Sequence, residues 1–327
     1  MNLLCTNDSL NTEVYIEELI FNRSKNVSLE LRSICKALTE KLKVKRLNLL
    51  ACNIGDEIAD DLADMLSHNS AVEELFLQRN NFTGEGAKIL AGGLCQNSYL
   101  KKLDFSDNFL GNVGAKAIIT TLTPDTSFTD ITGGRKLSAL HTLSLTAIQC
   151  GGIIGPGVAK MLHTNNTLKQ LDLGVDGGIG LICEALYFNR MLNCLHLEFD
   201  TFGSCNLVCR LLQNHVLRYL SIGNSFMGTY TSICKNEAVA LGRALKFNFA
   251  LEELHLYSYG FTDEGLKCLE EALVGNVKLR RLCLGRLPGM NPGLVRNGYS
   301  PKITFNCDCN IRTRRGEKFS YQPKLFH

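Results

Sequence analysis

The stretch LNLLACNIGDEIADDLADML, residues 47–66, contains the two patterns that decide the fold. In its first part Leu47 and Leu49 alternate with variable residues, which is typical of a short strand with one buried face. In its second part Ile58, Leu62 and Met65 recur at the spacing of one helix face. The stretch therefore predicts a strand, a loop and an amphipathic helix in succession.

The strand pattern recurs along nearly the whole chain. It consists of an apolar residue, two variable residues, a second apolar residue, one variable residue and a third apolar residue. Five of the nine intervals between successive copies are 28 residues, which chance would not produce. The sequence thus predicts about ten stacked strand–helix units within residues 1–285. Their first apolar positions are residues 16, 44, 72, 100, 140, 168, 192, 217, 251 and 279.

A second periodic signal is an asparagine three residues before the first apolar position of a strand. Each of these asparagines closes an apolar helical stretch. Because asparagine tolerates the left-handed conformation that ends many helices, we expect a helix C-cap of this kind at the same place in each unit. The asparagines are Asn69, Asn97, Asn165, Asn189, Asn214, Asn248 and Asn276.

These units resemble the leucine-rich repeats of the ribonuclease-inhibitor type, and residues 47–66 and 100–118 (LKKLDFSDNFLGNVGAKAI) match that style closely. Such repeats also form the sensing end of NACHT-type innate immune receptors and the body of Ran GTPase-activating proteins. The resemblance implies an α/β solenoid, a horseshoe with parallel strands on the concave face and helices on the convex face. Strands ~4.8 Å apart stacked against helices ~8–10 Å apart predict the same curvature.

The residues beside the second and third apolar positions of each strand should face the concave surface, because side chains alternate along a strand. Three Arg or Lys and six Asp or Glu fall there, so we expect a protein partner and no nucleic acid on this face. The later units contribute more rings, which either anchor a partner or are ordinary amphipathic surface residues. The predicted partner-binding residues are Phe76, Lys102, Asp104, Asp172, His196, Glu198, Phe199, Tyr219, Glu253, His255, Tyr257 and Arg281.

No motif predicts catalysis, a metal or a cofactor. Residues 151–160 (GGIIGPGVAK) are glycine-rich but lack the Gly-Lys-Ser/Thr ending of a phosphate-binding loop. Cys194 and His196 are two residues apart on one predicted strand, ~6.5–7 Å, which is too far for a direct hydrogen bond. The pair Cys205 and Cys209 lacks further ligands for zinc, which usually needs four. We therefore predict a non-enzymatic, protein-binding scaffold or regulator.

The resemblance leaves two alternatives open. Ran GTPase-activating proteins supply an arginine from the loops after their strands, and Arg23 and Arg79 occupy comparable positions. Such an arginine could stabilise charge on a transferring phosphoryl group. The acidic C-terminal segment usual in that family is replaced here by residues 286–327, which hold eight Arg or Lys against two acids. The second alternative is a fragment of the sensing region of a NACHT-type receptor.

The composition and the two chain ends indicate the class of protein and its cellular compartment. The 327 residues are 45% apolar with a net charge of +3, which allows a large core and argues against disorder. The segment MNLLCTNDSL lacks the basic and apolar regions of a signal peptide, so we predict a cytoplasmic protein with reduced cysteines and no membrane span. Insertions at 123–139 and 223–236 should form rim loops. Residues 286–327 should form a C-terminal cap, with Ile303 and Phe305 in a last strand, and a basic tail able to make weak contacts with acidic groups.

Overall fold

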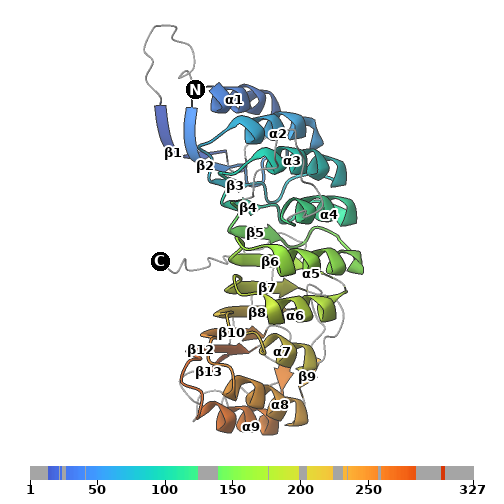
Figure 1. The fold of residues 1–327 in the computed structure, drawn as a ribbon, viewed down its shortest axis with the longest axis vertical. Helices are drawn as coiled ribbons and strands as arrows, with labels where there is room; N and C mark the ends of the chain where they lie inside the picture. Colours follow the sequence, from blue (N-terminus) through green and yellow to red (C-terminus); the bar gives the residue numbers. More distant parts are fainter. Residues whose placement is uncertain are drawn as a thin grey trace. The chain divides into compact units, whose positions relative to one another are not determined.

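The computed structural model of the protein divides into two compact units. Unit 1 comprises residues 1–121 and 125–140, and unit 2 comprises residues 122–124 and 141–327. In each unit, parallel strands line one side and helices line the other (Figure 1). The structure describes residues 14–21, 23, 27–40, 42–123, 139–175, 177–198, 205–223, 231–233, 235–256, 259–284 and 303–305.

In unit 1, strand β1 pairs in parallel with β2, β2 with β3, and β3 with β4. The pairing places Leu19, Leu47, Leu75 and Leu103 in one row, so that the second apolar position of each motif has the same place in every repeat. The elements are β1 (Val14–Ile20), α1 (Ser28–Glu40), β2 (Leu42–Asn48), the 3-10 turn η1 (Asp56–Ile58), α2 (Ala59–His68), β3 (Glu74–Phe76), α3 (Gly84–Gln96), β4 (Lys102–Asp104) and α4 (Gly111–Thr121).

In unit 2, strands β5, β6, β7, β8, β10, β12 and β13 pair in parallel in that order, and β9 pairs with β11 in a separate sheet. The strands are β5 (Thr142–Leu145), β6 (Gln170–Gly174), β7 (Cys194–Glu198), β8 (Tyr219–Gly223), β9 (Thr231–Ile233), β10 (Glu253–Leu256), β11 (Tyr259–Phe261), β12 (Arg281–Leu284) and β13 (Ile303–Phe305). The helices are η2 (Gly152–Ile154), α5 (Gly155–Thr164), α6 (Ile179–Phe188), α7 (Cys205–Leu211), α8 (Lys235–Lys246) and α9 (Asp263–Leu273).

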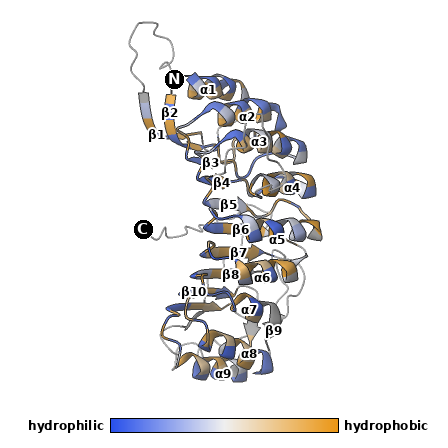
Figure 2. Cartoon of the chain, viewed as in Figure 1, coloured by the Kyte–Doolittle hydropathy of each residue, from blue (hydrophilic) through white to orange (hydrophobic). Residues whose placement is uncertain are grey.

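The α/β leucine-rich-repeat architecture predicted from the sequence is confirmed. The second apolar residue of each of the ten predicted motifs lies on a strand, and the expected last strand at Ile303–Phe305 pairs with β12. In α2, Leu62 and Met65 are fully buried, and the helices carry both hydrophilic and hydrophobic residues, as one buried side requires (Figure 2). Most of the predicted insertions and of the C-terminal cap and tail lies outside the described residues.

The predicted conformation of the periodic asparagines is wrong, although their position at the helix ends is right. Asn69, Asn97, Asn165 and Asn189 are extended, with φ from −96° to −68° and ψ from 129° to 135°. Their side chains do the capping: Oδ1 accepts the backbone N–H groups two and three residues later. Nδ2 donates to a carbonyl near the end of the preceding repeat's helix, as shown by Asn69 to Leu38 at 2.7 Å. The amide therefore joins successive repeats, which a left-handed backbone would not do.

Unit 1 also contains a second, shorter row of buried asparagines, which the sequence analysis does not predict. Asn80 and Asn108 are buried three residues after the last apolar position of their motifs. Asn80 Oδ1 accepts the backbone N–H groups of Cys52 and Ile54, and its Nδ2 donates to the carbonyl of Leu49 at 2.8 Å. The 28-residue interval between the two asparagines was the available signal.

Candidate functional site

The strand side chains that point away from the helices form a strand face in each unit. On the face of unit 1, Glu18, Arg46, Glu74 and Lys102 stand in register on adjacent strands. Arg46 lies 3.2 Å from Glu74 and 3.7 Å from Glu18, and the hydrogen bond to Glu74 raises its pKa. The alternating charges thus largely neutralise one another.

Three of the predicted partner-binding residues lie on β3 and β4 of this face. The Lys102 ammonium lies 4.9 Å from the centre of the Phe76 ring, a distance at which cation and ring attract. Asp104 Oδ1 accepts from the backbone N–H and the hydroxyl of Ser106, at 3.1 and 2.7 Å. Burial raises the pKa of Asp104 despite these bonds. Asp104 therefore organises the turn after β4 as well as facing outward.

The strand face of unit 2 brings distant residues together by register alone. Asp172, His196, Ser221 and His255 follow one another across β6, β7, β8 and β10. A neighbouring row contains Gln170, Cys194, Tyr219, Glu253 and Arg281. We call the group His196, Glu198, Tyr219, Ser221, Glu253 and His255 the histidine cluster.

Each histidine of the cluster has a carboxylate partner two residues away on its own strand. His196 Nε2 lies 3.2 Å from Glu198 Oε1, and its Nδ1 lies 2.8 Å from the Ser221 hydroxyl. His255 Nε2 lies 3.3 Å from Glu253 Oε2, which also accepts from Arg281 at 3.2 Å. The His255 ring packs on the Tyr219 ring with centres 5.0 Å apart. The cluster is therefore ordered by its own contacts.

The pKa values of the two histidines are shifted in opposite directions. Burial opposes the charge on His196, but the hydrogen bond and charge of Glu198, together with Asp172, outweigh it and raise the pKa. Burial lowers the pKa of His255, and Glu253 only partly offsets this effect. Two neighbouring imidazoles thus differ in their tendency to carry charge.

Glu198, His196 and Ser221 are connected in the order carboxylate, imidazole, hydroxyl, which is the order in a serine hydrolase triad. Ser221, however, has no exposed surface, so its hydroxyl cannot meet a substrate. The nearby Cys194 thiol is no better nucleophile, because burial raises its pKa to about 12. The geometry therefore favours a structural role for these groups.

The predicted binding residues differ in accessibility. Glu198 and Arg281 expose 30% and 52% of their side chains, whereas His255 and Glu253 expose 11% and 17% of theirs. Phe199 and Tyr257, predicted to join the ring cluster, lie outside the described residues. Any contact with a partner would therefore be made mainly by Glu198, Tyr219 and Arg281.

The two arginines of the GTPase-activating alternative occupy one repeat position. Arg23 and Arg79 both have left-handed backbones, with φ of 57° and 60°, in the loops after β1 and β3. Arg79 forms an ion pair with Asp107 at 3.1 Å.

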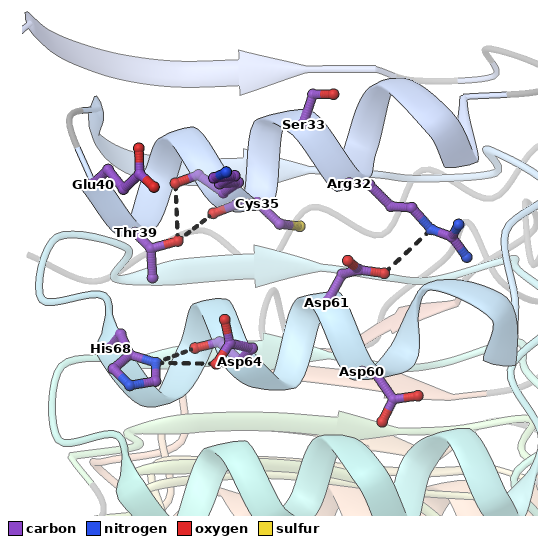
Figure 3. Close-up of a pocket in the computed structure, with 10 residues that line it drawn as sticks. Arg32, Ser33, Cys35, Thr39, Glu40, Asp60, Asp61, Asp64 and His68 are labelled. Atoms are coloured by element: carbon purple, nitrogen blue, oxygen red, sulfur yellow. Dashed lines mark hydrogen bonds and ion pairs between the residues drawn. The ribbon is translucent and has the colours of Figure 1, made fainter.

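A polar groove lies on the helix side of unit 1, between α1 and α2 (Figure 3). Two ion pairs lie within the groove, Arg32 with Asp61 at 3.4 Å and His68 with Asp64 at 3.2 Å. The buried Cys35 thiol has its pKa raised to about 12, chiefly by burial. The groove thus offers no activated thiol nucleophile, and its lining is mildly acidic, with four Asp or Glu against Arg32 and Lys36.

Within the described ranges, no three His, Cys, Asp or Glu side chains are grouped to hold a metal ion. None of the helices formed by these residues is long and apolar enough to cross a membrane.

Parallel strands backed by helices, with asparagine amides joining successive repeats, define a leucine-rich-repeat solenoid. The chain is similar in sequence to leucine-rich-repeat proteins of the ribonuclease-inhibitor type. The Leucine Rich repeat family matches residues 96–118.

Ribonuclease inhibitor from Sus scrofa is 28% identical over 71% of this chain and half of its own length. NACHT, LRR and PYD domains-containing protein 5 from Homo sapiens is 27% identical over 82% of this chain and 21% of its own length. The chain therefore spans half or less of either relative. Among solved structures, the Leptospira interrogans LRR protein LIC12759 aligns with 83% of this chain and 78% of its own, at 16% identity and a TM-score of 0.38. That likeness is too low to bear on fold or function.

Proposed function

We propose that this chain is a non-enzymatic, cytoplasmic scaffold or regulator that binds a protein through the strand face of unit 2. The observation that carries the proposal is the histidine cluster, in which residues from three strands hold one another in fixed orientations. Side chains fixed before binding lose little conformational entropy when a partner arrives.

The chemistry of the face suits a polar protein surface. Glu198 and Glu253 present carboxylates, Arg281 presents a guanidinium, and Tyr219 supplies a ring with a polar tip. Tyrosine and arginine are enriched among residues that dominate binding energy at protein interfaces. Phe76, Lys102 and Asp104 remain predicted contacts of unit 1.

The relatives support the same kind of function. One of them is, by its name, an inhibitor of ribonuclease, which acts on another protein. A cytoplasmic setting is supported by the nine cysteines whose side chains the structure describes, all of which are free thiols. Thiols persist in reducing compartments.

A second candidate is favoured by the match to NACHT-containing proteins, which covers 82% of this chain but 21% of the relative. In this alternative the chain corresponds to the sensing region of such a receptor. The binding surface would be the same, and the partner would be the sensed molecule or another domain of the receptor.

The proposal is tested by affinity capture with the full chain, followed by a binding titration with the purified partner. Replacing Tyr219 or Arg281 with alanine should each weaken binding about 30-fold, as expected for loss of ~2 kcal/mol at a dominant contact. His215→Ala, exposed where α7 leads into β8, is the matched control and should leave the affinity unchanged. Equal affinity of all three variants would refute the assignment of this face.

A further inference from the structure

The edge of unit 2 where helices lead into strands differs in chemistry from the strand face. We define the rim as the exposed side chains from two residues before to four residues after each capping asparagine of unit 2. Seven of them are apolar and six are Lys or Arg. The apolar residues are Tyr187, Phe188, Met191, Phe247, Phe249, Val274 and Val277. The cations are Lys169, Arg190, Arg218, Lys246, Lys278 and Arg280.

The rim is continuous because the capping asparagines are bonded to one another. The Nδ2 of Asn214, Asn248 and Asn276 donates to the backbone carbonyl of the preceding capping asparagine, at 3.3, 3.0 and 3.3 Å. Residues that flank these asparagines therefore lie side by side from one repeat to the next. At the other end of the rim, the Phe188 ring lies 5.7 Å from the ring of His163 and 5.1 Å from that of Tyr187.

The exposure of the apolar side chains is far above that of ordinary partly buried residues. Phe188, Phe247 and Phe249 are each more than 60% exposed, and Val274 and Val277 more than 80%. Exposed apolar residues that recur along one edge mark a surface with a function, whereas scattered ones do not. Exposed rings and branched side chains arranged along one edge suit insertion into a lipid surface.

The charge of the rim has one sign. Glu252 is the only acid at these positions in the described part of unit 2, and it pairs with Arg280 at 3.7 Å. The other five cations stand among the apolar side chains. Lysine and arginine can extend their charged ends toward phosphates while their stems cover apolar surface.

Unit 1 shows that this composition is not a requirement of the fold. Around Asn69 and Asn97 the same positions hold mostly small or polar residues, and Lys101 is neutralised by Glu73 at 2.8 Å. Tyr99 is the one large apolar side chain exposed there among the described residues. The repeat therefore tolerates a polar rim, and unit 2 departs from it.

We propose that the rim of unit 2 binds the surface of a membrane rich in anionic phospholipid. Rings and branched apolar side chains would enter the interface between head groups and acyl chains, and the cations would lie beside the lipid phosphates. This combination is typical of peripheral membrane binding, in which apolar burial and attraction to anionic lipid act together. The surface is separate from the strand face and does not depend on the function proposed above.

The test is flotation of the full chain with vesicles of phosphatidylcholine alone, and with vesicles in which about one third of it is replaced by phosphatidylserine. We expect binding to the second kind only, and release by about 0.5 M salt, which screens the attraction. A variant with Phe188→Ser, Phe247→Ser and Phe249→Ser should bind at least about tenfold more weakly. Tyr99→Ser, which removes the exposed ring beside the capping asparagine Asn97 of unit 1, should bind like the wild type.

A second variant, with Arg190→Glu and Lys246→Glu, tests the charge separately and should also lose at least about tenfold. Circular dichroism establishes that both variants fold. Equal flotation with the two kinds of vesicle, or wild-type binding by either variant, would overturn the proposal. Failure of the wild type to float with phosphatidylserine vesicles, while it binds immobilised polyglutamate through the same residues, would also overturn it and assign the rim to an acidic protein.

Discussion

Replacement of a capping asparagine should destabilise unit 2 far more than replacement of its neighbour. Asn214 is 1% exposed, and its Oδ1 accepts the backbone N–H groups of Val216 and Leu217, both at 2.7 Å. Its Nδ2 donates to the carbonyls of Leu186 and Asn189. Asn214→Ala removes these bonds and leaves at least two N–H groups and one carbonyl without a partner.

The size of the effect follows from the burial of those groups. A buried donor or acceptor left unsatisfied costs about 1–3 kcal/mol, so three of them give about 3–9 kcal/mol. Small backbone shifts that admit water should bring the loss toward the lower end, about 3–5 kcal/mol. This loss is comparable to that from truncating a large core residue.

The assay is urea unfolding of the full chain followed by circular dichroism, with hydrogen exchange measured on peptides from β7 and β8. The exchange data show whether unit 2 opens, even if unit 1 unfolds separately. Gln213→Ala, at the adjacent exposed position, is the control and should stay within about 0.5 kcal/mol of the wild type. If Asn214→Ala unfolds at the same urea concentration as this control, the asparagine row does not hold the repeats together.

Three further predictions concern single sites. Gly92→Ala should raise the free energy of unfolding by about 0.5–1 kcal/mol, because its Cβ meets no atom and α3 gains helix propensity. Gly93→Ala should lower it by about 1–3 kcal/mol, because the new Cβ would collide with the backbone of α2; thermal unfolding compares the two. His196 should titrate above 6.5 in NMR spectra and below it after Glu198→Gln. Because the folded state binds this proton more tightly, its contribution to stability is complete below pH 6.5 and is lost as the pH rises through the elevated pKa. Cys194, whose pKa is raised to about 12, should resist iodoacetamide at neutral pH until urea unfolds the chain; mass spectrometry of native samples with full labelling would disprove this.

The repeats could be predicted because each is specified locally. Leu47 and Leu49 alternate along a strand, and Ile58, Leu62 and Met65 follow a helix face, so the pattern alone predicts the elements and their order. Once the strands are aligned by their leucines, the strand face can be assigned position by position. This alignment predicts that Lys102 and Phe76 share that face. In the structure the Lys102 ammonium lies 4.9 Å from the centre of the Phe76 ring.

What could not be predicted depends on contacts between repeats. A single repeat cannot reveal that Asn69 reaches Leu38, 31 residues away, because the bond exists only once two repeats stack. The conformational propensity of asparagine predicts a left-handed cap. In the structure the Asn69 side-chain amide instead donates to a carbonyl of the preceding helix. In the same way, the bond from His196 to Ser221 depends on the register of two strands and on side-chain rotamers.

Site-specific photo-crosslinking tests the central claim, that the strand face of unit 2 binds a protein. A benzoylphenylalanine is introduced in place of Tyr219 on β8 and, in a separate protein, in place of Leu181, an exposed residue of α6. Both proteins are irradiated with the partner recovered by affinity capture. We expect a covalent adduct from position 219 and none from position 181. An adduct from position 181 alone would show that the helix side makes the contact and would contradict this claim.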